Sequence, residues 1–147
     1  MKKPSAVLLS SFCFFLIMVI LVSCSKEGGS NSTAINVANI SGTYKLTGLT
    51  VQLTPLPPQS ILDSIPDCQR DDLIKLNHDM SLYLVDNGVT CVPPANDTST
   101  WSLNGNTITI DTLTGTIQKY DGQFLIINST IDFNGFPVVA TETLTKQ

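Results

Sequence analysis

From residue 40 onward the chain alternates apolar and polar residues, and Asn, Asp and Gly interrupt this alternation at short intervals. A period of two places apolar side chains on one face of a β-strand, and no stretch shows a convincing helical period. The first alternating segment, residues 40–53, switches parity around Gly48, where a glycine favours a bulge or a bend. The pattern therefore predicts an all-β domain that begins with a long, kinked strand.

Seven more strands are predicted after the first. Segments 71–77 and 81–87 flank a tight turn and form one hairpin, and segment 99–112 forms a second hairpin around Asn104-Gly105-Asn106. Residues 114–146 supply three strands, with turns at Asp-Gly and Asn-Gly pairs. Eight short strands that can each pair with the next predict an antiparallel barrel or sandwich, and a closed barrel also removes exposed edges.

The connection between the first strand and the first hairpin, residues 54–70, contains four prolines. Proline cannot donate to a sheet ladder, so this segment is not a central strand. Its middle, "QSILDSI", predicts one or two helical turns.

The N-terminus has the layout of an export signal. Lys2 and Lys3 precede an uncharged apolar run over residues 6–22, and a small residue, Ser23, precedes Cys24. The competing interpretation is a membrane-spanning helix, but the run is slightly short and a polar spacer follows at once. Leu21-Val22-Ser23-Cys24 resembles the bacterial lipobox, in which a diacylglycerol is joined to the cysteine thiol and the chain is cut just before it. We therefore expect a lipoprotein signal peptide over residues 1–23, a flexible tether over 24–39 and a barrel domain over 40–147.

The chain has four cysteines, and the expected processing changes how many of them can form a disulfide. Cys13 would leave with the signal peptide and Cys24 would be acylated, which leaves Cys68 and Cys91 in an oxidising compartment where disulfides persist. The predicted hairpin brings these two to the same end. A metal or redox site is the alternative, but neither cysteine lies in a Cys-x-x-Cys motif and His78 lacks a partner at ligand spacing. We expect a structural disulfide.

The charge of the chain argues against two kinds of partner. The chain carries 8 basic and 12 acidic residues, and removal of Lys2 and Lys3 with the signal makes it still more acidic. An acidic surface argues against nucleic acid and against a basic patch on anionic lipid.

Several short motifs together resemble a known family. The lipobox, "SGTYKL" at 41–46, "CQRDD" at 68–72, Cys91 and "TWSLNGNTI" at 100–108 are similar to the small lipocalin-like lipoproteins of the Bacteroidetes. Tyr44 replaces the tryptophan of the Gly-x-Trp that opens many lipocalin barrels. The resemblance implies an eight-stranded antiparallel up-and-down barrel and no particular ligand.

A barrel of eight strands is filled by side chains or holds one small ligand. The inward-facing residues would either pack into a solid core or line an apolar pocket for a small hydrophobic ligand. The sequence does not separate these two interpretations. The candidate pocket residues are Tyr44, Leu46, Leu76, Leu84, Trp101, Leu103, Phe124 and Ile126.

No catalytic, cofactor or metal signature is present in the sequence. Asp71 and Asp72, with Asp67 nearby, lack the spacing of a calcium loop and are expected to be solvated charges. His78 lies in a predicted turn without a nucleophile. Asp63-Ser64-Ile65 and Asp111-Thr112-Leu113 resemble an O-glycan acceptor pattern of Bacteroidetes exported proteins, which makes Ser64 and Thr112 candidate modification sites.

We therefore expect a non-enzymatic, monomeric outer membrane lipoprotein, held to the membrane through Cys24, that binds a small hydrophobic ligand. The alternative is an envelope accessory module with a solid core, which contacts another protein through residues 54–70 and 92–98.

Overall fold

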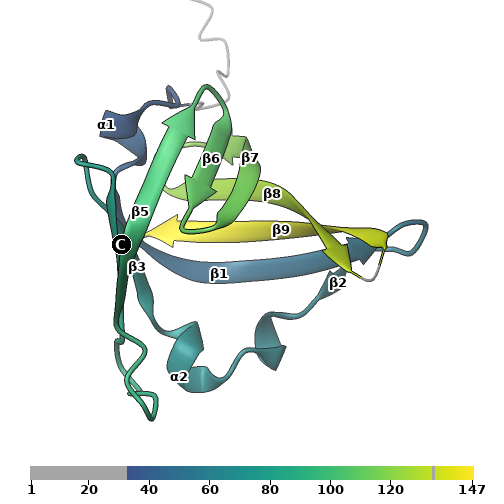
Figure 1. Ribbon diagram of the computed structural model, residues 1–147, viewed down its shortest axis with the longest axis horizontal. Coiled ribbons are helices and arrows are strands. Elements are labelled where there is room, and N and C mark those ends of the chain that lie inside the picture. Colours follow the sequence, from purple (N-terminus) through teal and green to yellow (C-terminus); the bar gives the residue numbers. More distant parts are fainter. Residues whose placement is uncertain (1–32, 134) are drawn as a thin grey trace, which may run out of the picture. The chain divides into compact units, whose positions relative to one another are not determined.

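The computed structural model describes residues 33–133 and 135–147, and Figure 1 shows their arrangement. The expected signal peptide, the expected acylation site Cys24 and residues 25–32 of the expected tether lie outside the described residues.

The described residues form one antiparallel sheet that closes on itself. Its strands follow the order β2-β1-β3-β4-β5-β6-β7-β8-β9, and β1 also pairs with β9. Eight strands make the closed barrel, while the two-residue β2 pairs only with the end of β1. This confirms the predicted all-β, eight-stranded antiparallel barrel. The bounds are β1 Gly42–Leu53, β2 Gln59–Ser60, β3 Leu73–Leu76, β4 Ser81–Val85, β5 Asp97–Asn104, β6 Thr107–Ile110, β7 Leu113–Tyr120, β8 Phe124–Phe133 and β9 Phe136–Lys146.

Three short helical segments accompany the strands. The 3-10 helix η1 (Leu62–Ser64) provides the helical turn predicted in the proline-rich connection, and α2 (Asp67–Arg70) follows it. Neither α2 nor the third segment, α1 (Val37–Ile40), was expected from the sequence. Figure 1 shows α1 and α2 at opposite ends of β3 and β5.

Helix α1 belongs to the folded domain rather than to a tether. The Asn36 side chain accepts a hydrogen bond from the Asn39 backbone N–H at 2.9 Å and so caps the helix. Ile40 is fully buried, and Ile35 and Val37 pack against the core. The folded part therefore begins before residue 40, because apolar residues in this stretch cover the end of the barrel.

The long first strand is kinked where the parity switch predicts it. The register between β1 and β9 shifts between Leu46 and Gly48. A Cβ on Gly48 would lie 3.1 Å from the Cβ of Thr143, tighter than ordinary packing. The bulge keeps apolar residues on the inner face on both sides of Gly48, as Leu46 lies opposite Leu144 and Val51 opposite Ala140.

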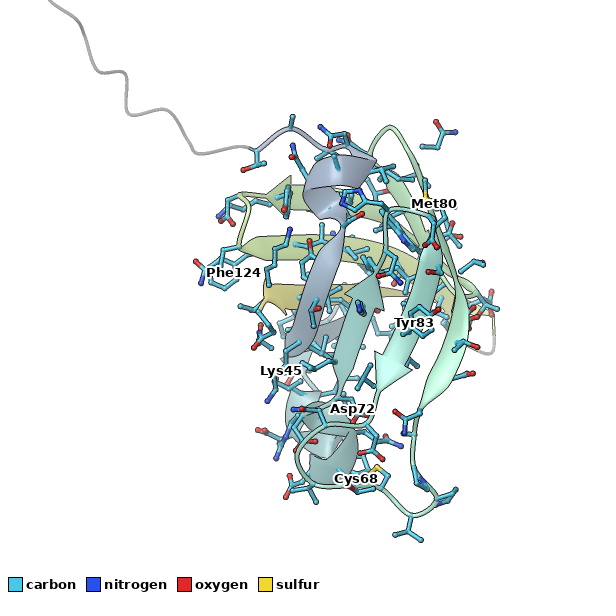
Figure 2. All side chains as sticks on the ribbon, turned by 90° about the vertical axis from the view of Figure 1, so that its left-hand side faces the viewer. Lys45, Cys68, Asp72, Met80, Tyr83 and Phe124 are labelled. Atoms are coloured by element: carbon cyan, nitrogen blue, oxygen red, sulfur yellow. A yellow bond between two sulfur atoms is a disulfide. The ribbon has the colours of Figure 1, made fainter. Side chains whose placement is uncertain are left out.

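The residues of β8 that face the barrel interior are not the ones expected from the sequence. We expected Phe124 and Ile126 to face inward, but Leu125 and Ile127 are the buried residues, at 0% and 3% exposure. Phe124 is 37% exposed, and Figure 2 shows it at the side of the barrel. The reason is that four consecutive apolar residues, Phe124 to Ile127, carry no alternation from which to choose a face.

The structure joins Cys68 to Cys91 in a disulfide, as the sequence predicts. Cys68 lies in α2 and Cys91 follows β4, with the two Cα atoms 5.1 Å apart. The bridge therefore ties the connection 54–70 to the loop after β4, at the end of the barrel away from α1. In Figure 2, Cys68 and Asp72 lie at one end and Met80 at the other.

Candidate ligand-binding interior of the barrel

The end of the barrel next to α1 is sealed by hydrogen bonds to the carbonyls of that helix. The Tyr44 hydroxyl donates to the Ile40 carbonyl at 2.6 Å, and the Tyr120 hydroxyl donates to the Asn39 carbonyl at 2.6 Å. The Lys146 Nζ also donates to the Asn39 carbonyl, at 2.9 Å. The last carbonyls of a helix lack partners within the helix, so these side chains satisfy the backbone while they close the barrel.

Burial keeps the Tyr44 hydroxyl protonated. Its side chain is fully buried, and burial, followed by its interaction with Tyr120, raises its pKa above the usual range. The hydroxyl therefore stays protonated and able to donate. The Lys146 Nζ lies 5.7 Å from the centroid of the Tyr44 ring, within cation-π range.

The same half of the barrel is packed solid. Trp101 is 2% exposed, and its Nε1 donates to the Asn77 carbonyl at 2.8 Å. The buried core contains Ile40, Tyr44, Leu76, Leu82, Trp101, Ile108, Ile117, Tyr120, Leu125, Ile127 and Leu144. Most of these residues lie toward α1, so this half has the character of a protein core rather than of a pocket.

The opposite half has inward-facing apolar residues that stay accessible. Leu53 is paired with Val138, and Val138 with Ile131, so all three side chains project to the same face as the buried Ala140. Leu53 is nevertheless 39% exposed and Ile131 47%. Leu84, which lies opposite Ile74 on the inner face, is 37% exposed. Inward-facing apolar side chains that solvent can reach define an open end.

The barrel wall at the open end differs from the wall near α1 because β1 changes its pairing partner along its length. Strand β1 pairs with β3 only over residues 42–45, and farther along it pairs with β2 at Thr50 and Val51. The connection 54–70 completes this side, and the Ile61 backbone N–H donates to the Leu49 carbonyl at 3.0 Å. The open half is thus bordered by a proline-rich connection that the disulfide holds in place.

Strands β8 and β9 each place one polar side chain on the inner wall of the barrel. Glu142 lies between the buried Ala140 and Leu144 on the inner face of β9, and burial raises the pKa of its carboxyl group. Ser129 is 2% exposed, and its Oγ has no hydrogen-bond partner among the described residues. Buried polar atoms normally have partners, so the Ser129 hydroxyl stands out.

A shallow hollow of about 290 Å³ lies at the ends of β4 and β5 on the open side. This is near the lower limit of small-molecule sites, which occupy about 300–1,000 Å³. Its lining residues are Tyr83, Leu84, Val85, Asn96, Asp97 and Thr98.

The candidate pocket residues do not form one group. Tyr44, Leu76 and Trp101 lie in the solid core, and Leu46 and Leu103 pack against it. Among these candidates only Leu84 lies in the open half, and Phe124 and Ile126 lie on the outer face.

Sequence reasoning missed Glu142 and Ser129. The signal that could have found Glu142 is its position in the alternating series Val138, Ala140, Glu142 and Leu144, where a charged residue occupies an inward position.

The acidic residues near the disulfide shape a loop. Asp71 accepts from the Val89 N–H at 2.8 Å, and Asp86 accepts from the Ala95 N–H at 3.1 Å. Asp72 accepts from the Asn87 N–H, while burial and then Asp86 and Asp71 raise its pKa. Within residues 33–133 and 135–147, no group of three His, Cys, Asp or Glu side chains is arranged to hold a metal ion.

The remaining sequence candidates lie on the surface. His78, Ser64 and Thr112 are exposed, and Thr112 donates to its neighbour Asp111 at 3.3 Å. The described residues contain no helix long and apolar enough to cross a membrane.

A closed antiparallel barrel of eight strands, sealed at one end by a short helix and open at the other, is the architecture of a binding module. Residues 40–132 match the model of the family described as lipocalin-like domain. The chain belongs to this lipocalin-like family. The comparisons with curated proteins and with solved structures found no match.

Proposed function

We propose that this protein is a non-enzymatic, membrane-anchored lipocalin-like lipoprotein that holds a small hydrophobic ligand in the open half of its barrel. One observation carries the proposal: Leu53, Leu84 and Ile131 face inward and yet are 37–47% exposed. Accessible apolar surface on a concave wall is the feature that small-molecule sites share.

The membrane anchor rests on the N-terminal sequence. Cys24 follows an apolar run and a lipobox-like Leu-Val-Ser, and the polar stretch after it is rich in Gly, Ser and Asn. One acyl chain holds a protein only marginally, whereas several chains on one cysteine anchor it stably. We place the protein at the outer membrane of a bacterial envelope, as a monomer.

The anchor has its own test. Radiolabelled palmitate supplied to the host should enter the wild-type protein and fail to enter Cys24→Ala. Labelling of the variant to the same extent would overturn the anchor without bearing on the barrel.

A fluorescence titration tests the ligand site. N-phenyl-1-naphthylamine, a neutral apolar fluorophore, should bind with one equivalent per protein and brighten on binding. Leu84→Asp and Ile131→Asp place a charge on the inner wall and should weaken binding at least about tenfold, because a charge is costly in an apolar site. Val89→Asp is the matched control, because Val89 is 60% exposed in a loop. No saturable binding by the wild type would contradict the proposal.

A second candidate function is supported by the loop after β4. Val92 is 97% exposed and Val89 60%, beside the disulfide that fixes this loop. Exposed apolar residues on a constrained loop suit contact with another envelope protein. A photo-crosslinker at position 92 in whole cells should then yield one specific adduct, and its absence alongside ligand binding favours the first function.

A further inference from the structure

We propose that Glu142 and Ser129 form the polar anchor of the barrel site, and that its ligand is a small amphiphile with an apolar body and one protonated amine. This inference rests on the proposed binding function and specifies the chemistry of the same site.

Glu142 is set in an apolar wall. It lies opposite Leu49 on one neighbouring strand and opposite Ile127 on the other, and its neighbours along the inner face of β9 are Ala140 and Leu144. Its side chain is partly exposed, so a ligand can reach it. No other titratable residue faces Glu142 from the adjacent positions of β1 or β8.

No cation of the described chain neutralises Glu142. Lys146 shares the inner face of β9 but lies four residues away, roughly 13 Å along the strand, and it is held by the Asn39 carbonyl. Lys45 and Lys75 alternate with inward-facing residues and project outward. Arg70 is paired with Asp63 and Asp67 in the connection.

Ser129 supplies a second acceptor. It lies opposite Ala140, so it is the diagonal neighbour of Glu142 across the β8–β9 pair, at a spacing of roughly 7–8 Å. The Oγ is buried without a partner among the described residues. One ammonium group donates three hydrogen bonds and can therefore serve a carboxylate and a hydroxyl oxygen together.

The order of residues along β9 sets the orientation of the ligand. From Glu142 toward the open end the inner face continues through Ala140 and Val138, beside the accessible Ile131 and Leu53. The ammonium would lie at Glu142 and the apolar body would extend past these residues toward the mouth. A carboxylate head would instead meet the charge of Glu142.

Three ligands with the same twelve-carbon chain test the inference by displacement of N-phenyl-1-naphthylamine at pH 7. Dodecylamine should bind at least about tenfold tighter than dodecanol, as a charge-assisted hydrogen bond exceeds a neutral one, and dodecanoate should bind weakest. In Glu142→Gln, the affinity for dodecylamine should fall to within about threefold of the affinity for dodecanol. Ser129→Ala should weaken the binding of dodecylamine more than the binding of dodecanol.

Asp132→Asn controls for net charge, since it removes one carboxylate at an exposed position and should leave all three affinities unchanged. Thermal melting of each variant verifies that it is folded. If the fluorophore binds but the three ligands bind equally, or if folded Glu142→Gln keeps the amine preference, the inference is overturned and the barrel site stands. If no probe binds, the proposed function itself fails.

Discussion

Glu142 and Lys146 face the barrel interior from the same strand, and no ion pair joins them. Lys146 is drawn to the sealed end, where it donates to the Asn39 carbonyl, while Glu142 stays on the wall of the open half. A separation of roughly 13 Å along β9 keeps the charges apart. At the α1 end of the interior the polar groups are hydrogen-bonded to one another. In the open half the Glu142 carboxylate is unpaired among the described residues and lies beside accessible apolar residues.

The unpaired carboxylate should make stability depend on pH. Burial raises the pKa of Glu142 in the folded state, so the folded protein holds this proton at a pH where the unfolded chain has lost it. Ionisation of Glu142 therefore costs stability as the pH rises through the folded pKa. Glu142→Gln should be more stable than the wild type at pH 7, and the gain should vanish below the unfolded pKa. Urea titrations at several pH values measure this, and a pH-independent difference would contradict it.

The seal at the α1 end should contribute measurably to stability. Tyr44→Phe removes the 2.6 Å hydrogen bond to the Ile40 carbonyl and should lower the free energy of unfolding by about 1–2 kcal/mol. Tyr83→Phe is the matched control, because Tyr83 is 42% exposed, and should change stability by less than about 0.5 kcal/mol. Equal effects from the two variants would show that the hydrogen bond to α1 is unimportant.

The disulfide should stabilise the fold. Cys68 and Cys91 are separated by 23 residues, and closing a loop of that length is worth about 3 kcal/mol in the chain-entropy model. The double variant Cys68→Ala/Cys91→Ala should lose about this amount, measured by urea unfolding without reductant. Addition of reductant should destabilise the wild type and leave the double variant unchanged. An unchanged midpoint in the double variant would contradict this.

Asp121 should give stability that acid removes. The Phe124 N–H donates to its carboxylate at 2.7 Å, the Gln123 N–H donates at 3.0 Å, and Lys119 lies within ion-pair distance. These bonds, that from Phe124 first, lower the pKa of Asp121 to about 2. The stabilisation is therefore complete above the unfolded pKa and is lost as the pH falls toward 2. Asp121→Asn should be less stable than the wild type at pH 7, and the difference should close as the pH falls through about 2. A deficit that persists in stronger acid would count against this role.

Much of the fold could be predicted from the sequence because period-two alternation and turn residues act locally. The eight strands and the bulge near Gly48 follow from such signals, and the disulfide follows from the cysteine count together with the predicted hairpin. The inner face of β8 could not be predicted, as Phe124 to Ile127 are all apolar and either parity satisfies the pattern. Helix α1 was missed because four residues are too few to show a helical period.

The candidate site was less accessible to sequence reasoning for a different reason. Alternation identifies which residues face inward but not how deeply each lies, so Trp101 in the core and Leu84 near the mouth look alike in sequence. Their separation depends on α1, which seals one end, and on the short β1–β3 pairing at the other. Both features come from contacts between distant parts of the chain.

Native mass spectrometry of the protein purified from its own host shows directly whether the barrel holds a ligand. The acyl chains proposed on Cys24 would persist under denaturing conditions, whereas a ligand in the barrel would be lost. The mass difference between native and denatured protein therefore reports the ligand alone. We predict one non-covalent small molecule per wild-type protein, absent from Leu84→Asp and retained in Val89→Asp. Wild-type protein that shows no such mass difference and takes up no N-phenyl-1-naphthylamine would contradict the account.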